Sequence, residues 1–189
     1  MDKNQRTAIY KLLSMGMSYP EKEIAQAIDS GWLFFQCKEY LKDDKDSLAI
    51  IDEIEKEYTD IEDLQVNYTT NFDLKISLYE SHYVLKDSKP EERGKFLFEL
   101  EKFYINAGVE LSDMDMPDYL PTELEFMHYL CAENLLDKQK IFIQNHLLNW
   151  VPQLLKKTEK HNIKFYSPLI KLIDNFVKKD FAYLKNLTF

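Results

Sequence analysis

The sequence predicts an all-α fold, and three observations carry that prediction. The chain of 189 residues holds only four glycines. It contains neither an Asn-Gly hairpin signal nor a sustained alternation of apolar and polar residues, which are the signs of strands. Apolar residues instead recur at helical spacing along most of the chain. We therefore expect an all-α, single-domain helical bundle of about eight or nine helices, spanning residues 1–189.

The first half of the chain carries signals for five helices. Ser18 and Glu21 match a capping box that would start the second helix, and Gly31 would end it. A polar break over residues 43–46 separates the third helix from the fourth. The five expected helices cover residues 7–17, 18–30, 32–41, 47–58 and 61–72.

Four further helices are expected in the second half. Ser88 would cap the first of them, with Pro90 in its first turn and Glu91 as the acid of the box, and Gly108 would end it. Pro152 disturbs the third, because proline removes a helical hydrogen bond. Residues 71–89 are the least regular stretch, so we expect a functional loop there. The four helices cover residues 88–107, 121–135, 138–160 and 167–184.

Composition is typical of a globular protein, with 45% hydrophobic and 30% charged residues. No apolar run reaches the roughly 18 residues that a membrane span requires, and the N-terminus lacks a signal-peptide core. Cys37 and Cys131 form neither a CxxC motif nor a disulfide-dense pattern. We therefore expect a cytoplasmic protein without integral membrane association.

Charge is unevenly distributed around a net charge of −9. Residues 43–133 hold 24 Asp and Glu against 8 Lys and Arg, whereas residues 151–189 hold 8 Lys against 3 acids. Nucleic acids and anionic membranes select for basic surfaces, so the acidic middle argues against both as partners. It favours a basic ligand, although acidic surfaces are also common on proteins without one.

The most informative stretch is Met114–Leu130, MDMPDYLPTELEFMHYL, in which an acidic turn leads into an amphipathic helix. Pro117 and Pro121 stiffen the turn, and Pro121 suits the first turn of the helix. Acidic residues crowd the positive end of the helix dipole: Asp113, Asp115 and Asp118. This arrangement suits a rigid acidic lip beside a peptide-binding groove. The alternative is a well-capped core helix with a solvated turn, in which Leu124, Met127 and Cys131 face the core.

Motifs for catalysis and cofactor binding are absent from the sequence. It has no phosphate-binding glycine loop, no GxSxG elbow, and no cysteine set near a histidine and an amide. Glu125 and His128 match half of a di-iron bundle motif, but no second copy exists. We therefore expect no catalytic residues, no metal site and no cofactor, with a helical enzyme or metal protein as the remote alternative.

Aromatic residues are frequent in the acidic half of the chain. They suit a groove that buries the apolar face of a basic amphipathic helix, whereas the alternative is that they are edges of the core. They are Tyr68, Phe72, Tyr79, Tyr83, Phe103, Tyr104, Tyr119, Phe126 and Tyr129.

Several of these motifs together resemble the TorD/DmsD/NarJ family of molybdoenzyme assembly chaperones. The segment Asp115–Pro121, DMPDYLP, is similar to the hallmark E-L-P-D-Y-L-P of the NarJ (nitrate reductase molybdenum cofactor assembly chaperone) branch. Tyr68–Asp73 followed by Ser77–Tyr83 resembles the family's Y-x-x-x-F-D and LY loop region. Arg93-Gly94, the Y-x-x-x-G of Tyr104–Gly108, and the later H-L-x-x-W-x-P and F-Y motifs extend the resemblance over residues 5–185.

The resemblance implies a cytoplasmic redox-enzyme maturation chaperone, not an enzyme. It would bind the N-terminal peptide of a molybdopterin-dependent oxidoreductase's catalytic subunit and hold it for molybdenum cofactor insertion. Asp118 would meet a cation of the client, and its replacement by Ala should weaken binding without unfolding the domain. The client-binding residues implied by the resemblance are Tyr68, Phe72, Tyr79, Tyr83, Pro117, Asp118, Tyr119, Pro121 and Glu125.

One departure from the family pattern bears on the client. Position 119 is Tyr, where the TorD and DmsD branches commonly carry His, which favours the NarJ branch. A twin-arginine leader of the kind that TorD and DmsD proofread is the alternative client peptide, and cofactor-delivery proteins are further expected partners. The oligomeric state stays open between a monomer and a domain-swapped dimer. A generic interaction domain without molybdoenzyme clients is a third interpretation.

Overall fold

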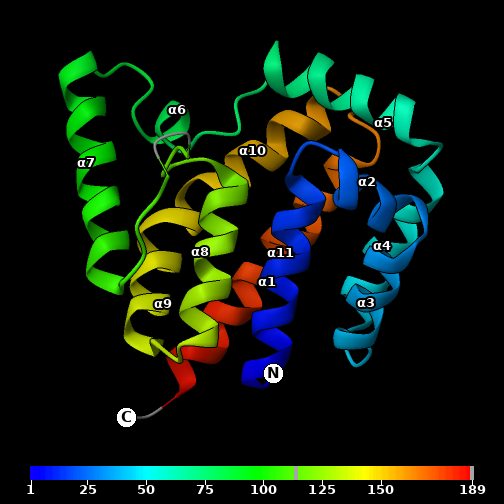
Figure 1. Ribbon diagram of the computed structural model, residues 1–189, viewed down its shortest axis with the longest axis horizontal. Helices are drawn as coiled ribbons and strands as arrows, with labels where there is room; N and C mark the ends of the chain where they lie inside the picture. The colour runs from blue at the N-terminus through cyan, green and yellow to red at the C-terminus, as the bar shows by residue number, and fades with distance from the viewer. Residues whose placement is uncertain (113–114, 188–189) are drawn as a thin grey trace.

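The computed structural model describes residues 1–112 and 115–187, and these form an all-α fold, as predicted (Figure 1). With η1 counted as the end of α5, and with α9, η2 and α10 counted as one continuous helix, the described residues form ten helices, against about eight or nine expected. The additional one is the single turn α6, inside the segment expected to be a loop. The elements are α1 Lys3–Met17, α2 Lys22–Asp29, α3 Trp32–Tyr40, α4 Lys45–Glu57, α5 Ile61–Tyr68, the π-helical η1 Thr69–Asp73, α6 Ser81–Val84, α7 Pro90–Ala107, α8 Leu120–Ala132, α9 Leu136–Phe142, the π-helical η2 Ile143–Leu147, α10 Leu148–Lys160 and α11 Tyr166–Asn186.

Aspartates start three helices in the first half of the chain. The Asp2 carboxylate accepts a hydrogen bond from the Gln5 N–H at 2.8 Å, and α1 therefore begins four residues before the predicted start at residue 7. Asp44 and Asp60 accept backbone N–H groups in the same way at α4 and α5. Each carboxylate satisfies an N–H group that the first helical turn leaves without a partner.

Both predicted capping boxes are wrong in detail. Ser18 donates its hydroxyl to a carbonyl one turn back in α1, and no side chain caps α2. The N-cap of α7 is Lys89 rather than Ser88, and its N–H is bound by Glu92 rather than by Glu91. Short polar side chains can bond backbone groups in either direction, so the spacing of the motif does not decide which bond forms.

The predicted glycine ends of α2 and α7 are confirmed. Gly31 has φ +72° and Gly108 has φ +96°, values in the left-handed region that glycine adopts without a Cβ penalty. A Cβ at position 108 would also lie 2.9 Å from the Tyr129 hydroxyl. The close approach of α7 to α8 therefore depends on this glycine.

The helix that Pro152 was expected to disturb runs on through the proline. Its irregularity lies earlier, in the π-helical turn Ile143–Leu147, which ends five residues before Pro152. A proline inside a helix leaves a carbonyl of the preceding turn without its usual N–H partner, and a wider turn is a common adjustment.

Helix α1 crosses the middle of the molecule and packs against α8, α3 and α11 (Figure 1). Helix α11 also packs against α4 and α10. Helix α7 forms one edge of the bundle, where it contacts α6 (Figure 1). Leu124, Met127 and Cys131 of α8 are fully buried, so the predicted core face of that helix is confirmed.

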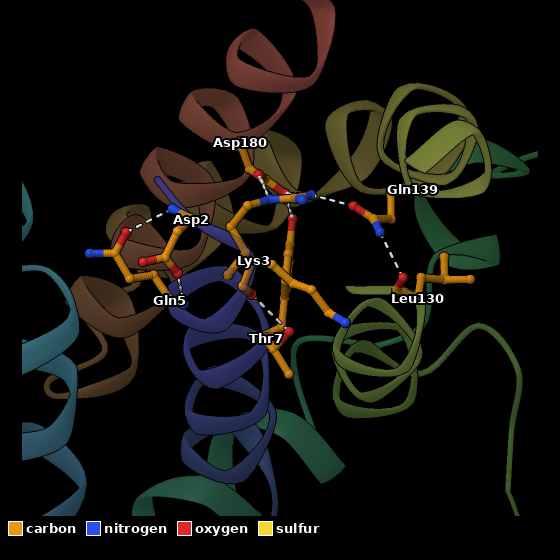
Figure 2. Close-up of polar contacts among 9 residues, drawn as sticks. Asp2, Lys3, Gln5, Thr7, Leu130, Gln139 and Asp180 are labelled. Carbon is orange, nitrogen blue, oxygen red and sulfur yellow. Dashed lines mark hydrogen bonds and ion pairs between the residues drawn. The ribbon is translucent and has the colours of Figure 1, made fainter. Parts of the chain in front are cut away.

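A buried polar network ties four helices together (Figure 2). The Arg6 guanidinium of α1 pairs with both carboxylate oxygens of Asp180 on α11, and it also donates to the side-chain carbonyl of Gln139 on α9. Gln139 in turn donates to the Leu130 carbonyl of α8 at 2.6 Å, and the Tyr10 hydroxyl donates to Asp180 at 2.8 Å. The arginine and its carboxylate are 2% and 0% exposed, so this ion pair is shielded from solvent.

Within the described residues, no helix combines the length and the apolar character that a membrane crossing requires.

Candidate peptide-binding cleft

A cleft with a cavity volume of about 610 Å³ runs along one face of α8. Its floor comes from Phe126, Tyr129 and Ala132 of that helix. The chain that leaves α7 forms one wall through Val109 and Leu111. The lining is therefore mainly apolar and aromatic, as in a groove that buries one face of a helical peptide.

The lip of the cleft is the segment 115–119, which precedes α8. The Pro117 carbonyl accepts a hydrogen bond from the Tyr104 hydroxyl at 2.8 Å, which anchors the lip to α7. An isolated antiparallel bridge joins Tyr79 to Tyr119, supported by the bond from the Leu120 N–H to the Leu78 carbonyl at 2.9 Å. The lip is thus held to two segments that lie far from it in sequence. Asp113 and Met114, which we assigned to the same lip, lie outside the described residues.

Tyr119 connects the cleft to two other predicted contact residues. Its hydroxyl lies 2.5 Å from the Tyr68 hydroxyl, and its ring lies 5.3 Å from the ring of Tyr79. Tyr68 also donates to the Met17 carbonyl at the end of α1. Because its ring is largely buried, the pKa of Tyr119 is raised above its ordinary value, which keeps the phenol neutral.

Pro121 and Glu125, two of the predicted client-binding residues, lie in the wall of the cleft. The Glu125 carboxylate is 44% exposed and pairs with the Lys11 ammonium of α1 at 2.7 Å. Asp115 also lines the cleft, where it accepts the Ser112 hydroxyl at 2.7 Å. The cleft therefore presents two carboxylates to a ligand, and one of them already holds a cation of the chain itself.

Asp118 does not lie where a client cation could reach it. Its side chain is 1% exposed, and one carboxylate oxygen accepts the Ser81 N–H at 3.1 Å. The expectation that it contacts the client directly is therefore not met in this conformation. Its backbone carbonyl also accepts the Glu80 N–H at 2.8 Å, so the residue holds the lip against α6.

Two further carboxylates are buried beside Asp118. Glu80 accepts from His146 at 2.9 Å, and Glu123 accepts from the Trp150 indole at 3.0 Å. Burial, and then the nearby charges of Glu80 and Asp118, raise the pKa of Glu123 well above its ordinary value. Each of the three carboxylates keeps one oxygen without a hydrogen-bond partner among the described residues.

Phe72 and Tyr83 lie in the core rather than in the cleft. Phe72 is 8% exposed and packs against Tyr166 at 5.2 Å between ring centroids. Tyr83 is 3% exposed, packs against Trp150 and donates to a backbone carbonyl in its own loop. For these two residues the alternative interpretation of the aromatic side chains, as part of the core, applies, because burial of a large ring is strongly favourable.

Sequence reasoning missed several residues of the cleft. Val109 and Leu111 follow the last turn of α7, in a stretch without periodicity, and His128 lies on the face of α8 that turns towards α1. The His128 ring nitrogen Nδ1 lies 2.9 Å from the Thr7 carbonyl oxygen, so this histidine is held by a hydrogen bond to α1. The one sequence feature that could have indicated this wall of the cleft is the spacing of Val109 and Leu111, two residues apart directly after Gly108.

The sequence model of the family described as "Nitrate reductase delta subunit" matches residues 36–156. The chain belongs to this family. The matched span of the nitrate reductase delta subunit family contains the whole of α7, the lip and α8, and therefore most of the cleft.

Relatives in this family carry the names of assembly chaperones. The chain is 26% identical to the perchlorate reductase assembly chaperone protein of Dechloromonas aromatica, over 97% of this chain and 90% of that protein. It is 31% identical to the chaperone protein TorD of Actinobacillus succinogenes, over 93% and 90%. It is 28% identical to the probable nitrate reductase molybdenum cofactor assembly chaperone NarJ of Bacillus subtilis, over 56% and 53%. These relatives include both TorD and NarJ proteins, so a position nearest to NarJ stays a prediction.

A solved structure shares the fold. A crystal structure of a protein from Archaeoglobus fulgidus, described as a redox enzyme maturation protein, superimposes with a TM-score of 0.60 at 19% identity. The match covers 91% of this chain and 93% of that chain.

Proposed function

We propose that this protein is a maturation chaperone and not an enzyme. It binds the N-terminal peptide of a molybdopterin-dependent oxidoreductase's catalytic subunit in the α8 cleft and holds it for cofactor insertion. Full-length relatives named as assembly chaperones of redox enzymes support the chaperone role. We infer a single domain that acts in the cytoplasm, before the client is assembled.

The proposal that the protein binds a peptide rests on one observation, which is that a single cleft combines an apolar floor, a rigid lip and exposed carboxylates. An amphipathic helix would bury its apolar side on Phe126 and Tyr129, against Leu111. A client cation would replace Lys11 as the partner of Glu125. A peptide that folds as it binds loses conformational entropy, and this apolar burial and charge pairing offset the loss.

Glu125 and Lys11 provide the test. In isothermal titration calorimetry with an N-terminal peptide of a molybdopterin oxidoreductase from the same genome, Glu125→Gln should weaken binding by about three- to tenfold, because a partly exposed charge pair is lost. Lys11→Ala should tighten binding by up to about threefold, because the client cation no longer competes with an internal one.

Glu133→Gln is the matched control, since it removes one carboxylate from the end of the same helix, outside the cleft. A scrambled peptide controls for general charge attraction. If Glu125→Gln and Glu133→Gln weaken binding equally, the peptide is attracted by net charge and does not lie in the cleft.

The alternative client is a twin-arginine leader, and the second carboxylate of the cleft favours it. Asp115 and Glu125 could each meet one of two adjacent guanidinium groups. A leader in which both arginines are replaced by lysine separates the two clients. A loss of more than tenfold would identify a twin-arginine reader, whereas a small change fits a peptide held mainly by its apolar face.

A further inference from the structure

Four basic side chains gather around the single turn α6, which packs against both α7 and α10 (Figure 1). His82 belongs to α6 and Lys86 follows it, while Arg93 comes from the start of α7 and Lys157 from the last turns of α10. None of the four lines the α8 cleft. They form a basic cluster in a chain whose net charge is −9.

The members of the basic cluster are close to one another. Arg93 Nη1 lies 3.1 Å from His82 Nε2, so the guanidinium donates to the ring and the ring nitrogen accepts. Lys157 Nζ lies 4.2 Å from the centroid of the Tyr83 ring, next to His82 on α6. The tyrosine is buried, and the lysine is thus held over a rigid aromatic face.

Lys86 completes the cluster from the loop that follows α6. Its ammonium donates to the Gln153 side chain of α10 at 3.1 Å. Gln153 lies one helical turn before Lys157, so the two lysines approach the same side of α10.

The charges of the cluster are not neutralised by neighbouring acids. Across residues 1–112 and 115–187, no carboxylate oxygen lies within the 4.0 Å of an ion pair from Lys86, Arg93 or Lys157. Asp87 and Glu92 are near in sequence but do not reach these nitrogens. The cationic groups of Lys86, Arg93 and Lys157 are therefore not paired with an acid among the described residues.

The proximity of these groups shifts two of their pKa values. Burial and then the charge of Lys86 lower the pKa of Lys157 below its ordinary value. Burial and then the charge of Arg93, together with Lys157, lower the pKa of His82, while the buried Asp118 acts in the opposite direction. An anion between these groups would remove the cost of holding them together.

We propose that the basic cluster is a binding site for the phosphate or diphosphate group of a small molecule. Arg93 offers a planar fork that matches two oxygens of such a group, and the ammonium groups of Lys86 and Lys157 offer point charges around it. His82 is neutral, with Nε2 accepting from Arg93, and it orients the guanidinium. The site is separate from the peptide cleft, and it stands whether or not the cleft binds a peptide.

The test is binding of pyrophosphate to the full chain, measured by calorimetry and by thermal unfolding at constant ionic strength set with chloride. Pyrophosphate should raise the melting temperature above that in chloride alone. Arg93→Ala and Lys157→Ala should each weaken its binding by about tenfold, because each removes a charge-assisted contact. Arg93→Lys keeps the charge but loses the fork, and it should still weaken binding measurably while leaving the fold intact.

Lys156→Ala is the matched control, because it removes the same charge from the neighbouring position of α10. It should change the affinity by less than about twofold. Equal losses in Lys156→Ala and Lys157→Ala, or no effect of pyrophosphate beyond that of chloride, would overturn the proposal.

Further ligands separate the sources of the anion. Inorganic phosphate that binds as tightly as pyrophosphate identifies a free-phosphate site, whereas a nucleoside diphosphate that binds more tightly identifies an organic phosphate. An acidic peptide that binds more tightly than any phosphate would instead mark a protein-docking surface and would refute a small-molecule site.

Discussion

Asp118 shows how far a residue's chemistry depends on its burial. The sequence presents it as an acid on a turn, yet its carboxylate is enclosed beside Glu80 and Glu123 and accepts the N–H of Ser81. An unpaired buried charge is costly, and burial raises the pKa of Glu123 in this group. Glu123 therefore makes the stability of the protein depend on pH.

Glu123 gives the first prediction. Its folded pKa lies well above the ordinary 4.5, so the folded state keeps a proton that the unfolded state releases as the pH rises past about 4.5. Stability should therefore fall with rising pH from that point up to the folded pKa. Glu123→Gln carries no titrating proton, so its free energy of unfolding should fall less over this window. Urea unfolding of both proteins at pH 5 to 9 measures the difference, and identical slopes would show that Glu123 is ionised in the fold.

At the scale of elements, the buried network joins α1 to α8, α9 and α11 through one arginine. Because Arg6 and Asp180 are both buried, water cannot replace either of them as a hydrogen-bond partner. Removal of one member of a buried ion pair leaves the other charge uncompensated.

Arg6→Ala should lower the free energy of unfolding by about 3–5 kcal/mol, as for other broken buried pairs. Chemical denaturation followed by circular dichroism measures this loss. Lys11→Ala, five residues further along α1, breaks only a half-exposed pair and should cost less than about 1 kcal/mol. Similar losses in the two variants would mean that the Arg6 network contributes little to stability.

The two glycines of α7 should respond in opposite directions to the same change. Gly108 has φ +96° and faces the Tyr129 hydroxyl, so Gly108→Ala should destabilise the protein by about 1–3 kcal/mol. Gly94 is inside the helix with no atom within 4 Å of an added Cβ, and Gly94→Ala should stabilise it by about 0.5–1 kcal/mol. Melting temperatures of the two variants, compared with that of the parent protein, test both the predicted loss and the predicted gain of stability. A stabilising Gly108→Ala would contradict the left-handed end of α7.

At the scale of the whole molecule, the acidic middle of the chain should attract the basic ligand proposed above. The excess of 24 acids over 8 bases in residues 43–133 lies on the same part of the chain as the cleft. Exposed charges are screened by salt, with a Debye length of about 10 Å at 0.1 M.

Peptide affinity should consequently fall as ionic strength rises, and the loss should be smaller in Glu125→Gln. Calorimetry of both proteins at low and high salt measures it. An affinity that does not change with salt would show that charge pairing contributes little and that the peptide is held by apolar burial.

Prediction succeeded where one residue decides the conformation and failed where several partners compete for the same side chain. Gly31 and Gly108 end helices as expected, because only the backbone at the glycine decides that conformation. The capping box at Ser18 failed, since its hydroxyl found a carbonyl in α1 instead of the next helix. Of the predicted client-binding residues, Tyr119, Pro121 and Glu125 line the cleft, whereas Tyr68, Phe72 and Tyr83 lie in the core. Their contact with a client stays a prediction.

What the sequence determined by itself is the all-α fold, the helix ends at its glycines, the core face of α8 and a stiff acidic segment before that helix. Each follows from residue spacing and backbone preference within about twenty positions. Only the tertiary structure decided that Asp118 is buried and Glu125 exposed, that Lys11 already pairs with Glu125 in the cleft, and that His82, Lys86, Arg93 and Lys157 meet around α6. Those outcomes depend on contacts between residues far apart in the chain, and such contacts leave no local pattern.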